Sequence, residues 1–273
     1  MRVALGLEYD GSCFSGWQLQ AHARSVQGCL EQALARVADH GVRVHCAGRT
    51  DAGVHARSQI VHFDTHAQRS LHSWVLGTNT NLPGEVSLLW AQFVDEEFHA
   101  RFSATGRTYR YLIMNRRSRP ALLRGKVTWE HRPLDAGRMH AAARHLLGEH
   151  DFSAYRAQGC QAKSPVRHVR RIDVRRNGEW IVLDIEANAF LHHMVRNIAG
   201  VLMAIGEGRQ SIDWSREVLE TRDRTLGGVT APPDGLYLVG VQYPERYAIP
   251  VPPAPILPFL GCGDHAAGDF DVK

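Results

Sequence analysis

"VRRIDVRRNGEWIVLDIEAN", residues 169–188, consists of two runs of alternating apolar and polar residues separated by Asn177-Gly178. Asn-Gly suits a two-residue turn in which both φ angles are positive, and the alternation is typical of strands with one buried face. The stretch therefore predicts a β-hairpin. A helical pattern precedes it at 135–148, and another at 190–208 follows it and ends at glycine.

Strand patterns flank this helix-hairpin-helix unit, at residues 107–115 and 235–243. A further short strand at 126–130 and a short helix at 211–222 elaborate it. The basic order is strand, helix, strand, strand, helix, strand, which is the order of a ferredoxin-like fold.

The first part of the chain repeats that order. Its strands are predicted at 2–9, 42–48, 58–65 and 85–94, and its helices at 25–40 and 71–82. We expect an α+β protein in which two similar ferredoxin-like (RNP-like) halves, residues 1–104 and 105–248, join antiparallel sheets around a central cleft. Residues 249–273 hold five of the twelve prolines and form a tail that should carry no chemistry.

The composition is that of a soluble globular protein, with 44% apolar and 22% charged residues. No apolar run approaches the roughly 20 residues that cross a bilayer, and the N-terminus does not resemble a signal peptide. A cytoplasmic location is therefore expected. The five cysteines are widely spaced without a C-x-x-C pair, which argues against a disulfide framework or a zinc ribbon.

The net charge of +4 is mild, but the basic residues are clustered. Residues 99–126 carry eight of them and no acidic residue, and residues 151–177 carry seven against two acidic ones. Arginine forks fit phosphate oxygens and stack on bases, so these stretches indicate a polyanionic partner. A GC-rich genome would explain the excess of arginine over lysine but not the clustering.

A polar loop, "AGRTDAGVHA" at residues 47–56, lies between two predicted strands. Its small residues would let another molecule approach Asp51 closely, since a rigid sheet can aim a loop side chain into a cleft. An ordinary turn in which Asp51 caps local amides, with Arg49 in solvent, explains the pattern equally well.

Aromatic and charged residues elsewhere also have two interpretations. Tyr109 and Tyr111 share one face of their strand, where a tyrosine could stack on a base or fill the core. Arg196 interrupts an apolar helix, so it requires either a solvated rim position or an ion pair, for which Asp51 is the candidate.

Sixteen histidines raise the question of a metal site, with His55, His62 and the pair His192-His193 as candidates. None has a partner and carboxylate at zincin-like spacing, so structural or RNA-contacting roles are favoured. On a helix His192 and His193 would point about 100° apart, one to the core and one to the cleft. No phosphate-binding glycine loop or nucleophile elbow occurs, so neither metal nor cofactor is expected.

Four separated motifs carry a resemblance to a known family. They are "GRTDAGVHA" at 48–56, "RTYRYLI" at 107–113, "FLHHMVRNIAGVL" at 190–202 and "DGLYLVGVQYP" at 234–244. Together they resemble the tRNA pseudouridine synthase A (TruA) family, and the likeness extends from about residue 3 to about residue 247.

The resemblance implies an isomerase that converts uridine to pseudouridine at positions 38, 39 and 40 in the anticodon stem-loop of tRNA. It also implies a homodimer that needs no metal or cofactor. In its terms Asp51 is the nucleophile, Tyr109 stacks on the target uracil and Arg196 pairs with Asp51. Four further residues are expected to bind substrate: Arg49 at the flipped nucleotide, Leu236 in the base pocket, and Arg116 and Arg117 at phosphates.

Several alternatives stay open from the sequence. Asp51 could attack C1′ of the ribose or C6 of uracil, or act through a glycal, and the Tyr109 hydroxyl could serve as a base. Two other functions are also possible: a non-catalytic RNA-binding protein on the same fold, and a metal-dependent hydrolase that uses the histidines.

Overall fold

A computed structural model describes residues 1–251 of the 273, so nearly all of the predicted proline-rich tail lies outside the described residues. The strands are β1 (Arg2–Tyr9), β2 (His45–Cys46), β3 (His55–Asp64), β4 (Val86–Val94), β5 (Gly106–Asn115), β6 (Thr128–Glu130), β7 (Gly148–Asp151), β8 (Val166–Asn177), β9 (Trp180–Ala187) and β10 (Leu236–Gln242). The helices are α1 (Val26–Ala38), α2 (Leu71–Asn81), α3 (Ala136–Ala143), α4 (Met194–Gly206) and α5 (Trp214–Thr221).

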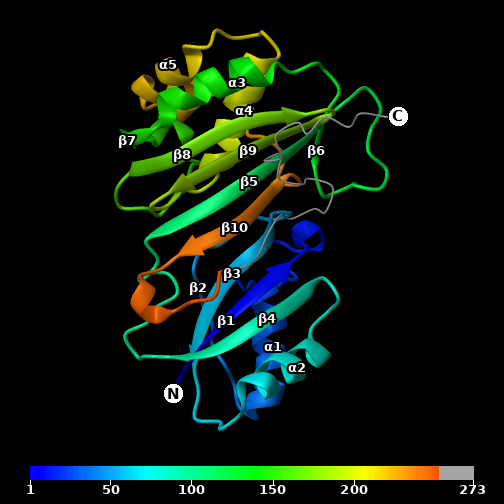
Figure 1. Ribbon diagram of the computed structural model, residues 1–273, viewed down its shortest axis with the longest axis vertical. Coiled ribbons are helices and arrows are strands. Elements are labelled where there is room, and N and C mark those ends of the chain that lie inside the picture. Colours follow the sequence, from blue (N-terminus) through cyan, green and yellow to red (C-terminus); the bar gives the residue numbers. More distant parts are fainter. Residues whose placement is uncertain (252–273) are drawn as a thin grey trace, which may run out of the picture.

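All the strands belong to one large mixed sheet, in the order β4-β1-β3-β10-β5-β9-β8-β7 (Figure 1). Short β2 pairs with β3, and β6 pairs with β5. The protein is thus of mixed α and β structure, as expected. Within the first half the order is β4-β1-β3-β2, and within the second it is β10-β5-β9-β8, so each half places its last strand beside its first.

The main strands within each half pair antiparallel, whereas two pairings of the sheet are parallel, β5 with β6 and β3 with β10. At the seam between the halves, β10 runs parallel to β3 and matches it at only two positions, Tyr237 with His55 and Leu238 with Ala56. The direction of β10 follows from its longer antiparallel pairing with β5 on the other side.

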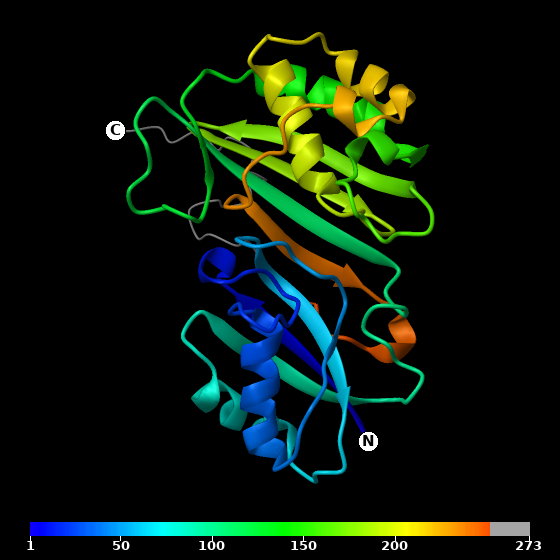
Figure 2. The same cartoon turned by 180° about the vertical axis from the view of Figure 1, so that it is seen from behind.

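All five helices pack on one face of the sheet, which is turned toward the viewer in Figure 2. One continuous apolar core lies beneath them and runs through both halves, from Leu5 and Leu34 to Leu183 and Ile198. A small second cluster, Leu112, Met114, Val127 and Tyr237, covers part of the opposite face. Among the described residues, no helix combines the length and the apolar character that a membrane span requires.

Local signals explain several boundaries. The two-residue turn of the β8–β9 hairpin is Gly178-Glu179, one residue later than the predicted Asn177-Gly178, because Asn177 still pairs with Trp180. Only Gly178 has a positive φ, +58°. Helix α1 begins where the Ser25 hydroxyl accepts a hydrogen bond from the Gly28 amide at 3.2 Å. Two predictions were wrong in extent. The strand expected at 42–48 is reduced to β2, and the helix expected from 190 begins only at Met194.

Candidate active site

The loop that carries Asp51 connects β2 to β3 and is held by its own backbone. The Trp17 amide donates to the Thr50 carbonyl at 3.0 Å, and the Gly53 amide donates to the Phe14 carbonyl at 3.3 Å. The Val54 amide closes a turn onto the Asp51 carbonyl at 3.1 Å. Backbone bonds on both sides of Asp51 therefore fix where its side chain starts.

Glycines let these segments approach each other. Gly16 has a φ of +90°, and a Cβ there would lie 2.8 Å from the Thr50 oxygen. Gly53 has a φ of +79°, and its Cβ would lie 2.9 Å from Pro233. The sequence interpretation gave the small residues of the Asp51 loop to an incoming molecule, but Gly53 among them is required by the chain's own packing.

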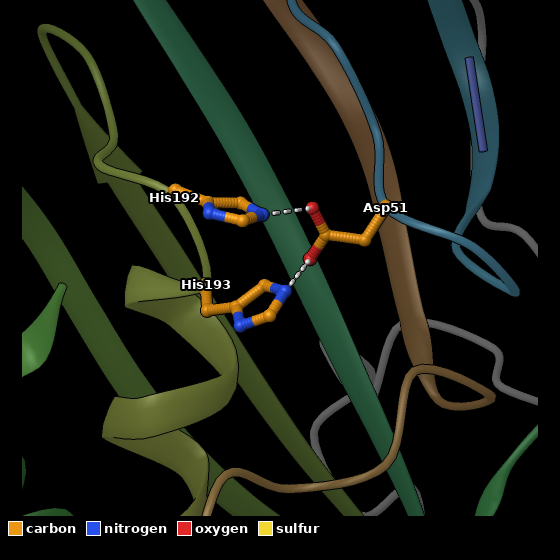
Figure 3. A group of neighbouring side chains, drawn as sticks. All are labelled: Asp51, His192 and His193. Carbon is orange, nitrogen blue, oxygen red and sulfur yellow. Dashed lines mark ion pairs between the residues drawn. The ribbon is translucent and has the colours of Figure 1, made fainter. Parts of the chain in front are cut away.

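The Asp51 carboxylate, about 22% exposed, faces three cationic or imidazole groups of the second half. Its Oδ2 lies 3.3 Å from Arg196 Nη1 and 3.3 Å from His193 Nε2, and its Oδ1 lies 3.4 Å from His192 Nε2. Figure 3 shows both imidazole rings turned toward the carboxylate across the seam. The ion pair predicted between Asp51 and Arg196 is present.

Arg196 is fixed at the start of α4 by a neighbouring loop. Its Nε donates to the Ala231 carbonyl at 2.8 Å, and the Ala231 amide donates back to the Arg196 carbonyl at 3.1 Å. This contact depends on Gly200, one turn further along, where a Cβ would lie only 1.8 Å from the Val229 oxygen. The guanidinium, 14% exposed, thus reaches Asp51 with little freedom to move.

His192 and His193 both face Asp51, so the expected 100° divergence was wrong. His193 precedes α4 and adopts a left-handed conformation with φ +59° and ψ 4°, which turns the two rings toward the same side, with centroids 4.0 Å apart. Burial lowers the pKa of His193 below its usual value; His192 and Arg196 add to this effect, whereas Asp51 opposes it.

The floor of the site comes from the two central strands. Tyr109 on β5 is 8% exposed and packs edge-on against Phe190, with ring centroids 5.0 Å apart. Burial raises the pKa of the Tyr109 hydroxyl well above its usual value, and the charge of Asp51 raises it further. Tyr111 instead fills the core and hydrogen-bonds Thr128 at 2.6 Å, so of the two tyrosines only Tyr109 lines the cleft.

These groups line one side of a cleft of about 1140 Å³ between α1 and the start of α4. Asp51, Tyr109, Leu236, His192 and His193 all contribute to its wall. Five arginines also line it: Arg43, Arg49, Arg101, Arg107 and Arg167. A carboxylate therefore lies beside a tyrosine in a basic cleft large enough for a nucleotide.

Comparison with known proteins identifies the family of this chain. The pattern of the tRNA pseudouridine synthase family matches residues 7–103 and 142–244. The chain belongs to this family. It is 62% identical over 250 residues to tRNA pseudouridine synthase A of Nitrosococcus oceani, covering 92% of this chain and 96% of that protein. It is 55% identical to the protein of the same name from Coxiella burnetii, covering 91% and 95% of the two chains.

Within this family member, part of the basic clustering is structural. Buried Arg107 donates to the carbonyls of Ala47, Arg101 and Asn188 at 2.8–3.0 Å. It thereby connects the strand before the Asp51 loop to the segment that leads into α4. The clustering of basic residues in the sequence could not reveal this role, because the burial of Arg107 depends on the segments that pack against β5.

Other basic residues of the same stretch are paired on the sheet. Arg110 forms an ion pair with Asp184 at 2.6 Å, and Arg116 pairs with Glu179 at 3.1 Å. Arg116 and Arg117 do not line the cleft, and Arg117 is exposed. Any contact between these two residues and RNA would therefore lie outside the catalytic pocket.

The remaining histidine candidates are structural. His55 is buried and accepts a hydrogen bond from the Gly11 amide at 3.0 Å. His62 accepts one from the Ala100 amide at 3.1 Å, and burial lowers the pKa of His62 to about 3. Neither ring is available as a ligand in the cleft.

Proposed function

We propose that the protein is a tRNA pseudouridine synthase, an isomerase that converts uridine to pseudouridine at positions 38, 39 and 40 of the anticodon stem-loop. The observation that carries this proposal is the placement of Asp51. The aspartate of the recognised motif lies in a basic cleft, paired with Arg196, in a chain 62% identical to a protein named for this activity.

Uridine and pseudouridine are isomers, so the reaction adds and removes no atoms. The N1–C1′ glycosidic bond breaks, the uracil turns, and a C5–C1′ bond forms while C5 loses a proton and N1 gains one. Asp51 acts as the nucleophile, at C1′ or at C6, or stabilises the charge that develops in a glycal route. Since a paired base cannot reach Asp51, the uridine must first be flipped into the cleft.

The neighbouring residues divide the remaining tasks. Arg196 orients the Asp51 carboxylate, and Tyr109 stacks on the target uracil, whose pocket Leu236 completes. Arg49, exposed at the cleft, holds the flipped nucleotide. A stacking role for Tyr109 is favoured over proton abstraction because its raised pKa makes the phenolate rare near neutral pH.

The proposal extends to the domain organisation and the oligomeric state. Residues 1–104 and 105–248 act as two ferredoxin-like halves, which is supported by their equal strand orders. We further propose a cytoplasmic homodimer that shares one tRNA, with Arg116 and Arg117 at phosphates away from the pocket. Sedimentation at working concentration should then give about twice the 30.5 kDa chain mass.

The activity is tested on an unmodified tRNA transcript with uridines at 38, 39 and 40. Pseudouridine is mapped by carbodiimide-dependent stops of reverse transcription, in buffer with and without EDTA. We expect stops at these positions in both conditions. Binding without stops would favour the RNA-binding alternative, and activity lost in EDTA and restored by zinc would favour a metal-dependent enzyme.

A further inference from the structure

Two imidazoles beside a nucleophilic carboxylate form an arrangement that the isomerisation itself does not require. Asp51 Oδ1 and His192 Nε2 are 3.4 Å apart, and Asp51 Oδ2 and His193 Nε2 are 3.3 Å apart (Figure 3). The three groups have ligand atoms within 4.8 Å of one another. Nitrogen and oxygen ligands lie about 2.0–2.2 Å from zinc, so two ligands of a tetrahedral ion are roughly 3.3–3.5 Å apart.

Both measured separations thus equal the edge of such a tetrahedron. The orientation also fits, since each imidazole presents Nε2 to the carboxylate. His192 is 47% exposed and His193 28% exposed, so the group opens to the cleft and an ion could enter.

We propose that Asp51, His192 and His193 form an inhibitory site for a borderline divalent cation such as Zn²⁺ or Co²⁺. The cation binds the protein in the absence of tRNA, and its ligands are one oxygen of Asp51 and the Nε2 atoms of His192 and His193. That it inhibits rests on the proposed function, in which a free Asp51 carboxylate attacks the substrate. With three protein ligands, the fourth position is left to water.

Arg196 limits the affinity of this site. Its guanidinium lies 3.3 Å from the same Oδ2, and its bond to the Ala231 carbonyl keeps it there. A bound cation would therefore lie close to a fixed positive charge. Removing that charge should strengthen cation binding while it weakens catalysis, an opposition that a general loss of structure would not produce.

The test measures Co²⁺ binding to the full-length protein alone, by the visible absorption of tetrahedral cobalt and its displacement by Zn²⁺. His192→Gln and His193→Asn each remove one ligand, and asparagine tolerates the left-handed conformation at 193. We expect each to weaken binding by about tenfold or more, because losing even an outer partner of a metal ligand costs about 10- to 100-fold. His72→Gln, at an exposed position of α2, is the matched control and should bind as the unmodified protein does.

Arg196→Met should bind Co²⁺ more tightly than the unmodified protein. Zn²⁺ should inhibit pseudouridine formation, EDTA should reverse the inhibition, and prior binding of tRNA should protect. Inhibition that persists unchanged in His192→Gln and His193→Asn, or the absence of a tetrahedral cobalt spectrum, would overturn the site. If the metal-free protein makes no pseudouridine, the proposed function fails, but the cobalt titration still decides whether the site exists.

Discussion

The two halves of the sheet hold their parts of the site in different ways. In the first half, the loop of Asp51 is fixed by backbone hydrogen bonds from Trp17, Gly53 and Val54. In the second, the carbonyls of His192 and Arg196 also accept backbone hydrogen bonds, from the Ala157 amide at 2.9 Å and the Ala231 amide at 3.1 Å. What directs the side chains there is the bond of Arg196 Nε to the Ala231 carbonyl and the left-handed conformation of His193. Asp51 is therefore positioned by the backbone of its loop, whereas the groups that face it are directed by one side-chain hydrogen bond and one left-handed residue.

This difference has a consequence for catalysis. A carboxylate on a backbone-held loop keeps its position when a neighbour is replaced. The orientation of the Asp51 carboxylate, however, depends on the second half, because Arg196 contacts its Oδ2 across the seam. At that seam the strands of the two halves pair only through the short β3–β10 match. Replacing Asp51 in the first half should therefore abolish the reaction, whereas replacing Arg196 in the second half should leave the carboxylate in place but wrongly oriented.

The largest effect is expected at Asp51. Asp51→Asn keeps the shape but removes the charge and nearly all nucleophilicity, so turnover should fall below detection. tRNA affinity should largely survive, because phosphate contacts elsewhere supply most of it. Single-turnover assays and filter binding measure the two quantities, with exposed Asp95→Asn as the control. A normal rate in Asp51→Asn would refute the mechanism.

Arg196→Met tests the other side of the seam. The rate should fall about 100-fold or more, as for the loss of a preorganised polar group in other active sites. If Arg196 acts only through Asp51, the double variant with Asp51→Asn should be no slower than Asp51→Asn alone. If the losses in rate of the two single variants instead add up in the double variant, Arg196 does not act only through Asp51. This comparison requires residual rates that can be measured.

Tyr109 lies on β5 of the second half, one strand from the seam, and its ring should matter more than its hydroxyl. Tyr109→Leu should lose about 1–3 kcal/mol of stacking, or about 10- to 100-fold in kcat/KM, whereas Tyr109→Phe should lose much less. Steady-state kinetics on the tRNA transcript decide between them. Equal losses in both variants would instead assign a chemical role to the hydroxyl.

Charge at the outer end of β5 should affect binding rather than chemistry. Arg116→Glu combined with Arg117→Glu should weaken tRNA binding about tenfold and reduce the salt dependence of log Kd by about 1–2, with kcat unchanged. Reversal of two exposed charges in the second half, Arg209 and Arg216, is the control. Equal affinities in all three proteins would show that the end of β5 is merely solvated.

The smallest effect on the reaction is expected from His62, in the framework of the first half. Because burial lowers the pKa of His62 to about 3, the unfolded chain takes up a proton between about pH 6.5 and 3 that the folded protein does not. Stability should therefore fall as the pH falls through this window, by about 1–2 kcal/mol for this residue at pH 5. Urea unfolding at pH 7.5 and 5.0 measures it, and His62→Gln should lose less over that interval. The same loss in both proteins would contradict the assignment.

Much of the fold could be predicted from sequence because the signals are local. The Ser25 cap, the glycine at the β8–β9 turn and the alternation in β8 and β9 act over a few residues, although the turn itself is shifted by one residue to Gly178-Glu179. The limits of β2 and of α4 could not, since each depends on what packs against the segment. The direction of β10 at the seam is likewise set by β5, more than 120 residues earlier in the chain.

The sequence by itself determined the family, the candidate nucleophile and the ion pair to be sought, since Asp51 and Arg196 stand in recognisable motifs. Only the tertiary structure decided that His192 and His193 both reach Asp51, because the left-handed turn at His193 is not encoded by spacing. It also showed that Arg107 bonds three backbone carbonyls and that Arg110 pairs with Asp184, so both charges have partners within the protein. The sequence shows where basic residues cluster, but their burial and their hydrogen-bond and ion-pair partners in the fold decide which of them are free to bind another molecule.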